Sequence, residues 1–145
     1  MNPVWATMTT SGAGAATGLQ LARSGPLVRL LNNGGSIVWA SSRRFPDLLL
    51  KAGQYVAFGS RILVMQYDGN LVVYAPEGPI WDAGTGGRSC ESGCLAAFQS
   101  DGNLVVYEGG LPIWASLTAG RGAWLELSGT LPPISILDAR LSRIW

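Results

Sequence analysis

Short runs of aliphatic residues, separated by turn residues, dominate the second half of the chain. Residues 62–81 read ILVMQYDGNLVVYAPEGPIW, with turn signals at the Asp-Gly and Glu-Gly-Pro segments. Aliphatic and β-branched runs bounded by such signals are typical of β-strands. No segment keeps an apolar stripe at helical spacing over ten residues, so we expect an all-β fold with negligible helix.

The same pattern occurs twice. Residues 95–114 read LAAFQSDGNLVVYEGGLPIW and repeat residues 62–81 with an offset of 33. Weaker copies flank this pair, and five tryptophans punctuate the chain: Trp5, Trp39, Trp81, Trp114 and Trp145. A strand repeat with a Trp at a fixed place predicts sheets arranged around an axis, each giving its Trp to a shared core. Three units, from residue 48 to 145, would close such a body.

The N-terminal part of the chain holds less than a complete set of units. Residues 1–42 contain one full unit and the end of another. We therefore expect a partial unit at 1–42, a linker at 43–47 and a complete domain at 48–145. Unpaired strands in a partial unit would be a liability, so we expect this segment to pack on the complete domain or on another chain, with a dimer as the outcome.

A polar set recurs at alternate positions in both strong copies. Side chains at alternate positions of a strand share one face. The two expected faces consist of Gln66, Asp68, Asn70, Val72 and Tyr74, and of Gln99, Asp101, Asn103, Val105 and Tyr107. Carboxylates, amides and phenols together alternate hydrogen-bond acceptors and donors as adjacent sugar hydroxyls require, and Val suits the C–H face of a ring. The alternative is structural, since Asp-Gly-Asn is also a turn signature. Strict alternation over nine residues favours a strand.

The composition argues against several classes of function and site. The 145 residues carry a net charge of +1 and only 13% charged residues, so no electrostatic partner such as nucleic acid is indicated. No run approaches the roughly 18 apolar residues of a membrane span, and no signal peptide is visible. The chain has no His, which is the commonest general base and metal ligand. We therefore expect no metal and no cofactor. The two cysteines, Cys90 and Cys94, are too few for a structural zinc site and form either a small-loop disulfide or two free thiols.

Both polar sets follow the pattern Gln-x-Asp-x-Asn-x-Val-x-Tyr, which resembles the mannose-binding signature of the bulb-type (snowdrop-like, monocot mannose-binding) lectins. Residues 50–56 resemble the opening strand of that domain, and Pro-Ile-Trp resembles the ends of its units. The resemblance covers residues 48–145 well and 1–42 loosely. It implies a β-prism II of three four-stranded antiparallel sheets with pseudo-threefold symmetry, plus an N-terminal partial prism unit. It also implies one candidate sugar site per sheet, no metal, and a secreted or cell-surface location.

The resemblance further implies a role for each member of the signature. Asp68 and Asn70 would hold the axial 2-hydroxyl of mannose, Gln66 would reach O3, Tyr74 would reach O4, and Val72 would touch the ring carbons. The second set would repeat these roles. The third unit, around residues 127–136, and the N-terminal unit lack the pattern, so we expect no working mannose site on either.

The cysteines depart from the pattern of the family. Many relatives carry a disulfide between a Cys at the position of Gly69 and a Cys near position 90. Because Gly69 cannot form that bond, the resemblance leaves only a bond between Cys90 and Cys94, or none.

These observations favour a non-enzymatic, metal-independent lectin for mannose or mannose-containing glycans. Its sites are shallow, so affinity would come from several sites engaged together. An enzymatic alternative is a glycosidase whose acid pair would be formed by Asp68 and Asp101, with Glu77, Asp82 or Glu108. It is disfavoured because a catalytic carboxylate pair lies about 5–10 Å apart, whereas Asp68 and Asp101 are expected on separate sheets. The alternative is an interaction module, similar to lectin-like bacteriocins or wall-associated lectin modules, whose sugar sites are vestigial. Activity that survives mutation of both aspartates would indicate this alternative.

Overall fold

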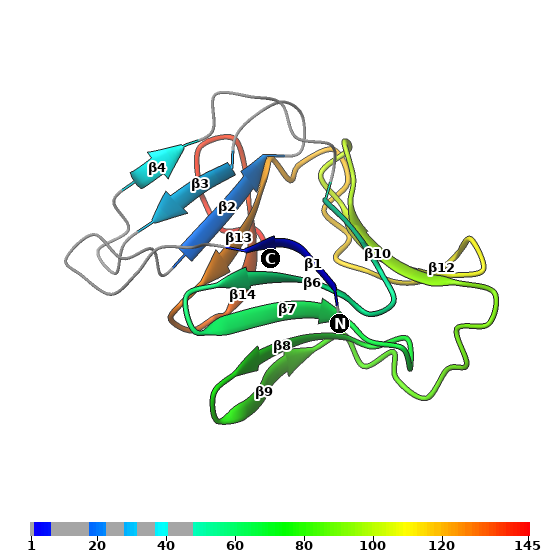
Figure 1. The fold of residues 1–145 in the computed structure, drawn as a ribbon. Helices are drawn as coiled ribbons and strands as arrows, with labels where there is room; N and C mark the ends of the chain where they lie inside the picture. Colours follow the sequence, from blue (N-terminus) through cyan, green and yellow to red (C-terminus); the bar gives the residue numbers. More distant parts are fainter. Residues whose placement is uncertain (1, 7–17, 23–27, 32–36, 41–47) are drawn as a thin grey trace.

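The computed structural model describes residues 2–6, 18–22, 28–31, 37–40 and 48–145 (Figure 1). Every regular element in these residues is a β-strand, as the aliphatic runs and turn signals predict. The strands form three sheets around a common interior (Figure 1). The three-sheet, all-β architecture is therefore confirmed.

The first sheet has the strand order β1-β6-β7-β8-β9. Its strands are β1 (Asn2–Ala6), β6 (Gln54–Phe58), β7 (Arg61–Met65), β8 (Leu71–Ala75) and β9 (Gly78–Asp82). The second sheet has the order β12-β11-β10-β5. Its strands are β5 (Leu48–Lys51), β10 (Cys94–Phe98), β11 (Leu104–Glu108) and β12 (Leu111–Ala115). The third sheet has the order β14-β13-β2-β3-β4. Its strands are β2 (Gly18–Ala22), β3 (Val28–Leu31), β4 (Ile37–Ala40), β13 (Trp124–Ser128) and β14 (Ile134–Leu137).

N-terminal strands take part in two of the three sheets, which therefore contain five strands where four were expected. Strand β1 pairs in parallel with β6, and β2 pairs antiparallel with β13, far away in the sequence. Between residues 48 and 145 the third sheet has only β13 and β14, so β2 to β4 complete it. The expected linker at 43–47 lies outside the described residues, and the division at that point stays a prediction.

Each sheet contains one hairpin in an equivalent register. Val64 pairs with Val72 in the first sheet, and Ala97 pairs with Val105 in the second. Glu126 pairs with Ser135 at the same place in the third sheet. Because the registers match, a position in one sheet can be compared directly with its counterparts in the other two.

Alternate residues of these hairpins form the core. They are Leu63, Met65, Leu71 and Val73 in the first sheet, Ala96, Phe98, Leu104 and Val106 in the second, and Leu125, Leu127, Ile134 and Ile136 in the third. All are buried, as period-two alternation predicts for strands with one face inward.

Three of the periodic tryptophans meet against this core. The ring centroids of Trp81 and Trp114 lie 5.9 Å apart, those of Trp81 and Trp145 lie 5.8 Å apart, and those of Trp114 and Trp145 lie 5.6 Å apart. All three pairs are edge-to-face, an arrangement worth about 0.5–1.5 kcal/mol per pair beyond burial of the rings. The expectation that each unit gives its Trp to a shared core is confirmed for these three residues.

Candidate functional site

Each polar set lies on a hairpin, and only its second half is a strand. Residues 66–70 form the turn between β7 and β8, and residues 99–103 form the turn between β10 and β11. The expectation of one continuous strand through all nine residues is wrong. Gly69 and Gly102 both have a φ of 85°, a left-handed conformation that ends a strand and favours glycine. The structural alternative, that Asp-Gly-Asn is a turn signature, describes the backbone correctly.

The aspartate of each set shapes this turn. Asp68 Oδ1 accepts a hydrogen bond from the backbone N–H of Asn70 at 3.0 Å, and Asp101 Oδ1 accepts one from the N–H of Asn103 at 2.9 Å. Such Asx turns hold a carboxylate in place over a tight loop. Both aspartates remain exposed at the surface.

The turn also brings the two ends of each set together. Gln66 Nε2 donates to Tyr74 Oη at 2.8 Å, and Gln99 Nε2 donates to Tyr107 Oη in the second sheet. A phenol that accepts a hydrogen bond keeps its own O–H as a donor, so each tyrosine is positioned to donate outward. The valine between the two ends is almost fully buried, with 2% of Val72 and 3% of Val105 exposed.

The site asparagines are held through their amide oxygens. Asn70 Oδ1 accepts from the backbone N–H of Thr85 at 3.1 Å. Asn103 Oδ1 accepts from the N–H of Thr118 at 3.2 Å and from the Ser116 hydroxyl at 3.0 Å. An amide whose oxygen is engaged in this way keeps its NH₂ group on the opposite side. Each set thus gathers a carboxylate, two amides and a phenol in fixed orientations.

Comparison with known proteins shows which family this chain belongs to. No protein-family model matches the chain. A monocot mannose-binding lectin from Gastrodia elata is 34% identical, with a TM-score of 0.55 over 68% of this chain and 88% of that one. A lectin from Allium sativum is 36% identical, with a TM-score of 0.54 over 68% of this chain and 92% of that one. The chain belongs to the monocot mannose-binding lectin family.

A curated relative is similar to a shorter stretch of the chain. The mannose-specific lectin of Galanthus nivalis is 47% identical over 43 residues, which is 28% of this chain. The match spans about a quarter, 27%, of that relative's length. The likeness to the family thus rests mainly on the solved structures.

Two threonines of this lectin also hold the turns of the two sites, and the sequence patterns above did not identify them. The Thr85 hydroxyl donates to the Gly69 carbonyl at 2.7 Å, and the Thr118 hydroxyl donates to the Gly102 carbonyl at 2.7 Å. Both threonines are buried, at 5% and 1% exposure. Each follows the Trp of its unit by four residues, so the repeat offset of 33 could have revealed them.

The two sites differ at their rims. Asp82 Oδ1 accepts from Asn70 Nδ2 at 3.3 Å and from the backbone N–H of Gly84 at 2.7 Å. In the second sheet the corresponding positions hold Ala115 and Leu117. The first site therefore has an additional carboxylate, and the second has an exposed apolar side chain.

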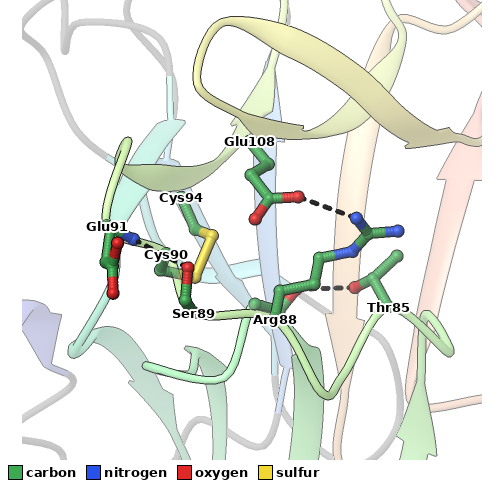
Figure 2. A network of polar contacts seen from close by, with 8 residues as sticks. Thr85, Arg88, Ser89, Cys90, Glu91, Cys94 and Glu108 are labelled. Carbon is green, nitrogen blue, oxygen red and sulfur yellow. Dashed lines mark hydrogen bonds and ion pairs between the residues drawn. A yellow bond between two sulfur atoms is a disulfide. The ribbon is translucent and has the colours of Figure 1, made fainter.

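The loop that follows β9 lies over the first site and is tied to the second sheet. An ideal Cβ on Gly86 would lie 3.2 Å from Asp68 Oδ2, so the loop passes close to the site carboxylate. Farther along, Arg88 Nη1 contacts Glu108 Oε2 at 2.7 Å, and Cys90 and Cys94 form a disulfide (Figure 2). Of the two states that the sequence left open for the cysteines, the structure contains the disulfide.

The β13–β14 hairpin of the third sheet carries no copy of the polar set. Ser135 and Leu137 take the places of Val72 and Tyr74, and the turn at residues 129–133 contains no Gln, Asp or Asn. Among the described residues, no three His, Cys, Asp or Glu side chains gather into a group that could hold a metal ion. No helix able to cross a membrane occurs in the described part of the chain.

Proposed function

We propose that this chain binds mannose or mannose-containing glycans through two sites, one on the first sheet and one on the second. The observation that carries the proposal is the repeated side-chain geometry: in both sheets an Asx turn presents a carboxylate beside an oriented asparagine, and a glutamine donates to a tyrosine. The family relationship supports it, since the Gastrodia relative is a mannose-binding lectin and the Galanthus relative a mannose-specific one.

The chemistry of each site suits adjacent hydroxyls of a pyranose. Asp68 supplies acceptor oxygens, Asn70 supplies an amide NH₂ group, and Tyr74 supplies a phenolic O–H. No step of this recognition needs a metal or a cofactor. The groups lie on the surface and not in a closed cavity, so one monosaccharide binds weakly and branched glycans gain affinity by engaging several sites.

Assembly and location follow as part of the same proposal. A homodimer would double the number of sites and raise the avidity for a glycan-bearing surface. The Cys90–Cys94 disulfide is typical of proteins of oxidising compartments, which supports a secreted or cell-surface location. Light scattering during size-exclusion chromatography measures the mass of the assembly, and a monomer mass would contradict the dimer.

Isothermal titration with methyl α-mannoside tests the sites, with methyl α-galactoside as the control sugar. Asp68→Asn and Asp101→Asn are suitable variants because the amide oxygen of Asn can still accept the turn hydrogen bond while the charge is lost. We expect two sites per chain in the native protein, one in each single variant and none in the double variant. Unchanged mannoside binding in the double variant would refute the assignment of these faces. Absence of any heat from the native protein would favour the interaction module with vestigial sites.

A further inference from the structure

The two sites differ in how the NH₂ group of the asparagine is engaged. In the second site, the side-chain hydrogen bonds of Asn103 to described residues all involve its amide oxygen, which accepts from the Ser116 hydroxyl and the backbone N–H of Thr118. In the first site, Asn70 Nδ2 donates to Asp82 Oδ1 at 3.3 Å. The NH₂ group is thus open to a ligand in the second site and shared with a carboxylate in the first.

The carboxylate of Asp82 is fixed on the outer face of the first sheet. Asp82 pairs directly with Val72 across β8 and β9, and directly paired residues place their side chains on the same face of a sheet. Its Oδ1 atom also accepts from the backbone N–H of Gly84 at 2.7 Å, which holds the group in one orientation. The corresponding residue of the second sheet is Ala115, whose side chain has no polar atom. The two sites therefore differ by one oriented acceptor group.

The charges around the first site are not balanced by a nearby base. Asp68 and Asp82 are both exposed, and neither forms an ion pair with another residue that the structure describes. The loop over this site contains Arg88, but its guanidinium contacts Glu108 at 2.7 Å (Figure 2). Two carboxylates thus flank the amide of Asn70, and both keep oxygen lone pairs for a ligand.

This difference decides which ligand group is preferred beside each asparagine. An ionised carboxylate only accepts hydrogen bonds, whereas an amide NH₂ group only donates them. A ligand group that donates is therefore favoured in the first site, and a group that only accepts is favoured in the second. A hydroxyl does both, so a mannoside suits either site.

We propose that Asp82 is a specificity-determining residue, which makes the first site selective for a saccharide that presents a protonated amine beside Asn70. This inference rests on the proposed function, because it concerns the ligand group that lies between Asp68 and Asn70. Hydrogen bonds between an ammonium and a carboxylate are charge-assisted and stronger than those of a hydroxyl. One chain thus offers two sites of different preference, and a glycan that carries free amino sugars engages the first.

The test uses the full chain with one site left active at a time. Asp101→Asn leaves the first site, and Asp68→Asn leaves the second. Two probes differ only at the carbon that bears the 2-hydroxyl, which is the group expected between Asp68 and Asn70. Methyl 2-amino-2-deoxy-α-mannoside carries a donor-only ammonium in mildly acidic buffer, and methyl 2-deoxy-2-fluoro-α-mannoside cannot donate at this carbon.

The quantity that decides is the ratio of the affinities for the amino and the fluoro probe, measured by NMR competition against methyl α-mannoside. We expect this ratio to be about threefold to fivefold higher in the first site than in the second, the range of an exposed charge-assisted contact. The ratio separates recognition from a structural role. If Asp82 only held the loop, its replacement would weaken both probes equally and leave the ratio unchanged.

Three variants at the rim complete the test. Asp82→Ala gives the first site the side chain of the second, and Asp82→Asn keeps an oxygen for the Gly84 N–H while it removes the charge. We expect both variants to lower the ratio to that of the second site, and the reciprocal Ala115→Asp to raise the ratio of the second site.

The outcomes distinguish this inference from the function on which it rests. Methyl α-mannoside binding with a ratio that neither Asp82→Ala nor Asp82→Asn changes would overturn the role of Asp82 and leave the mannose sites standing. Absence of methyl α-mannoside binding from both single-site proteins would instead contradict the proposed function, and the inference would fail with it.

Discussion

Removing one buried hydroxyl near the second site tests whether the threonines hold the site turns. Thr118→Val keeps the shape of the side chain and replaces its hydroxyl with a methyl group. In the structure that hydroxyl donates to the Gly102 carbonyl at 2.7 Å and lies 2.8 Å from the Ser116 hydroxyl, which contacts Asn103. The change therefore removes the partner of a carbonyl inside the turn and disturbs the contacts that orient the site asparagine.

The expected loss of stability follows from the burial of these groups. Leaving a buried acceptor without its donor costs about 1–3 kcal/mol, and the added methyl group recovers part of this by apolar burial. We expect a net destabilisation of about 1–2 kcal/mol, which is a decrease of about 3–7 °C in Tm for a chain of this size. Mannoside affinity at the second site should fall about threefold to tenfold, since 1.4 kcal/mol is a factor of ten.

Urea unfolding followed by Trp fluorescence measures the stability, and titration with methyl α-mannoside measures the site. Thr130→Val is the matched control, because the Thr130 hydroxyl also makes a hydrogen bond, to Ser128 at 2.9 Å, but is exposed to water. The control should change the free energy of unfolding by less than about 0.5 kcal/mol. Equal effects of Thr118→Val and Thr130→Val would refute the reasoning.

Three further changes test other parts of the molecule. Leu117 is exposed and has a φ of 60°, and the equivalent residue of the first unit is Gly84 with a φ of 67°. Leu117→Gly should therefore stabilise the protein by about 0.5–1 kcal/mol in urea unfolding, and Gly84→Leu should destabilise it. A change of the same sign in both variants would contradict this. Breaking the bond between Cys90 and Cys94 with dithiothreitol should cost about 2 kcal/mol, the loop-closure value for so short a loop, and an unchanged urea midpoint would argue against it. Trp145→Ala removes one ring of the three-Trp cluster and should cost about 3 kcal/mol in the same assay; a loss below 1 kcal/mol would show that the cluster contributes little.

Local patterns in the sequence were sufficient to predict much of the fold and the position of both polar sets. Aliphatic runs and turn signals are properties of neighbouring residues, so the strands β7, β8, β10 and β11 could be located without any long-range information. The offset of 33 between the two strong copies also identified Trp81 and Trp114 as members of a shared core. The nine-residue alternation does not mark one strand, because a glycine near the middle of the pattern permits a turn that also places alternate side chains together.

Pairing between distant strands was decided only by the tertiary structure. Gln20 and Glu126 are 106 residues apart, yet their side chains are joined by a hydrogen bond because β2 completes the third sheet beside β13. No local pattern encodes such a partner, since any strand with one apolar face could fill that edge. The amino-acid sequence by itself thus determined the strands, the shared Trp core and the positions of the two polar sets. The tertiary structure decided which strands complete each sheet, which hydroxyls hold the turns, and which groups lie beside the site asparagines, because these depend on contacts that form only when the whole chain is folded.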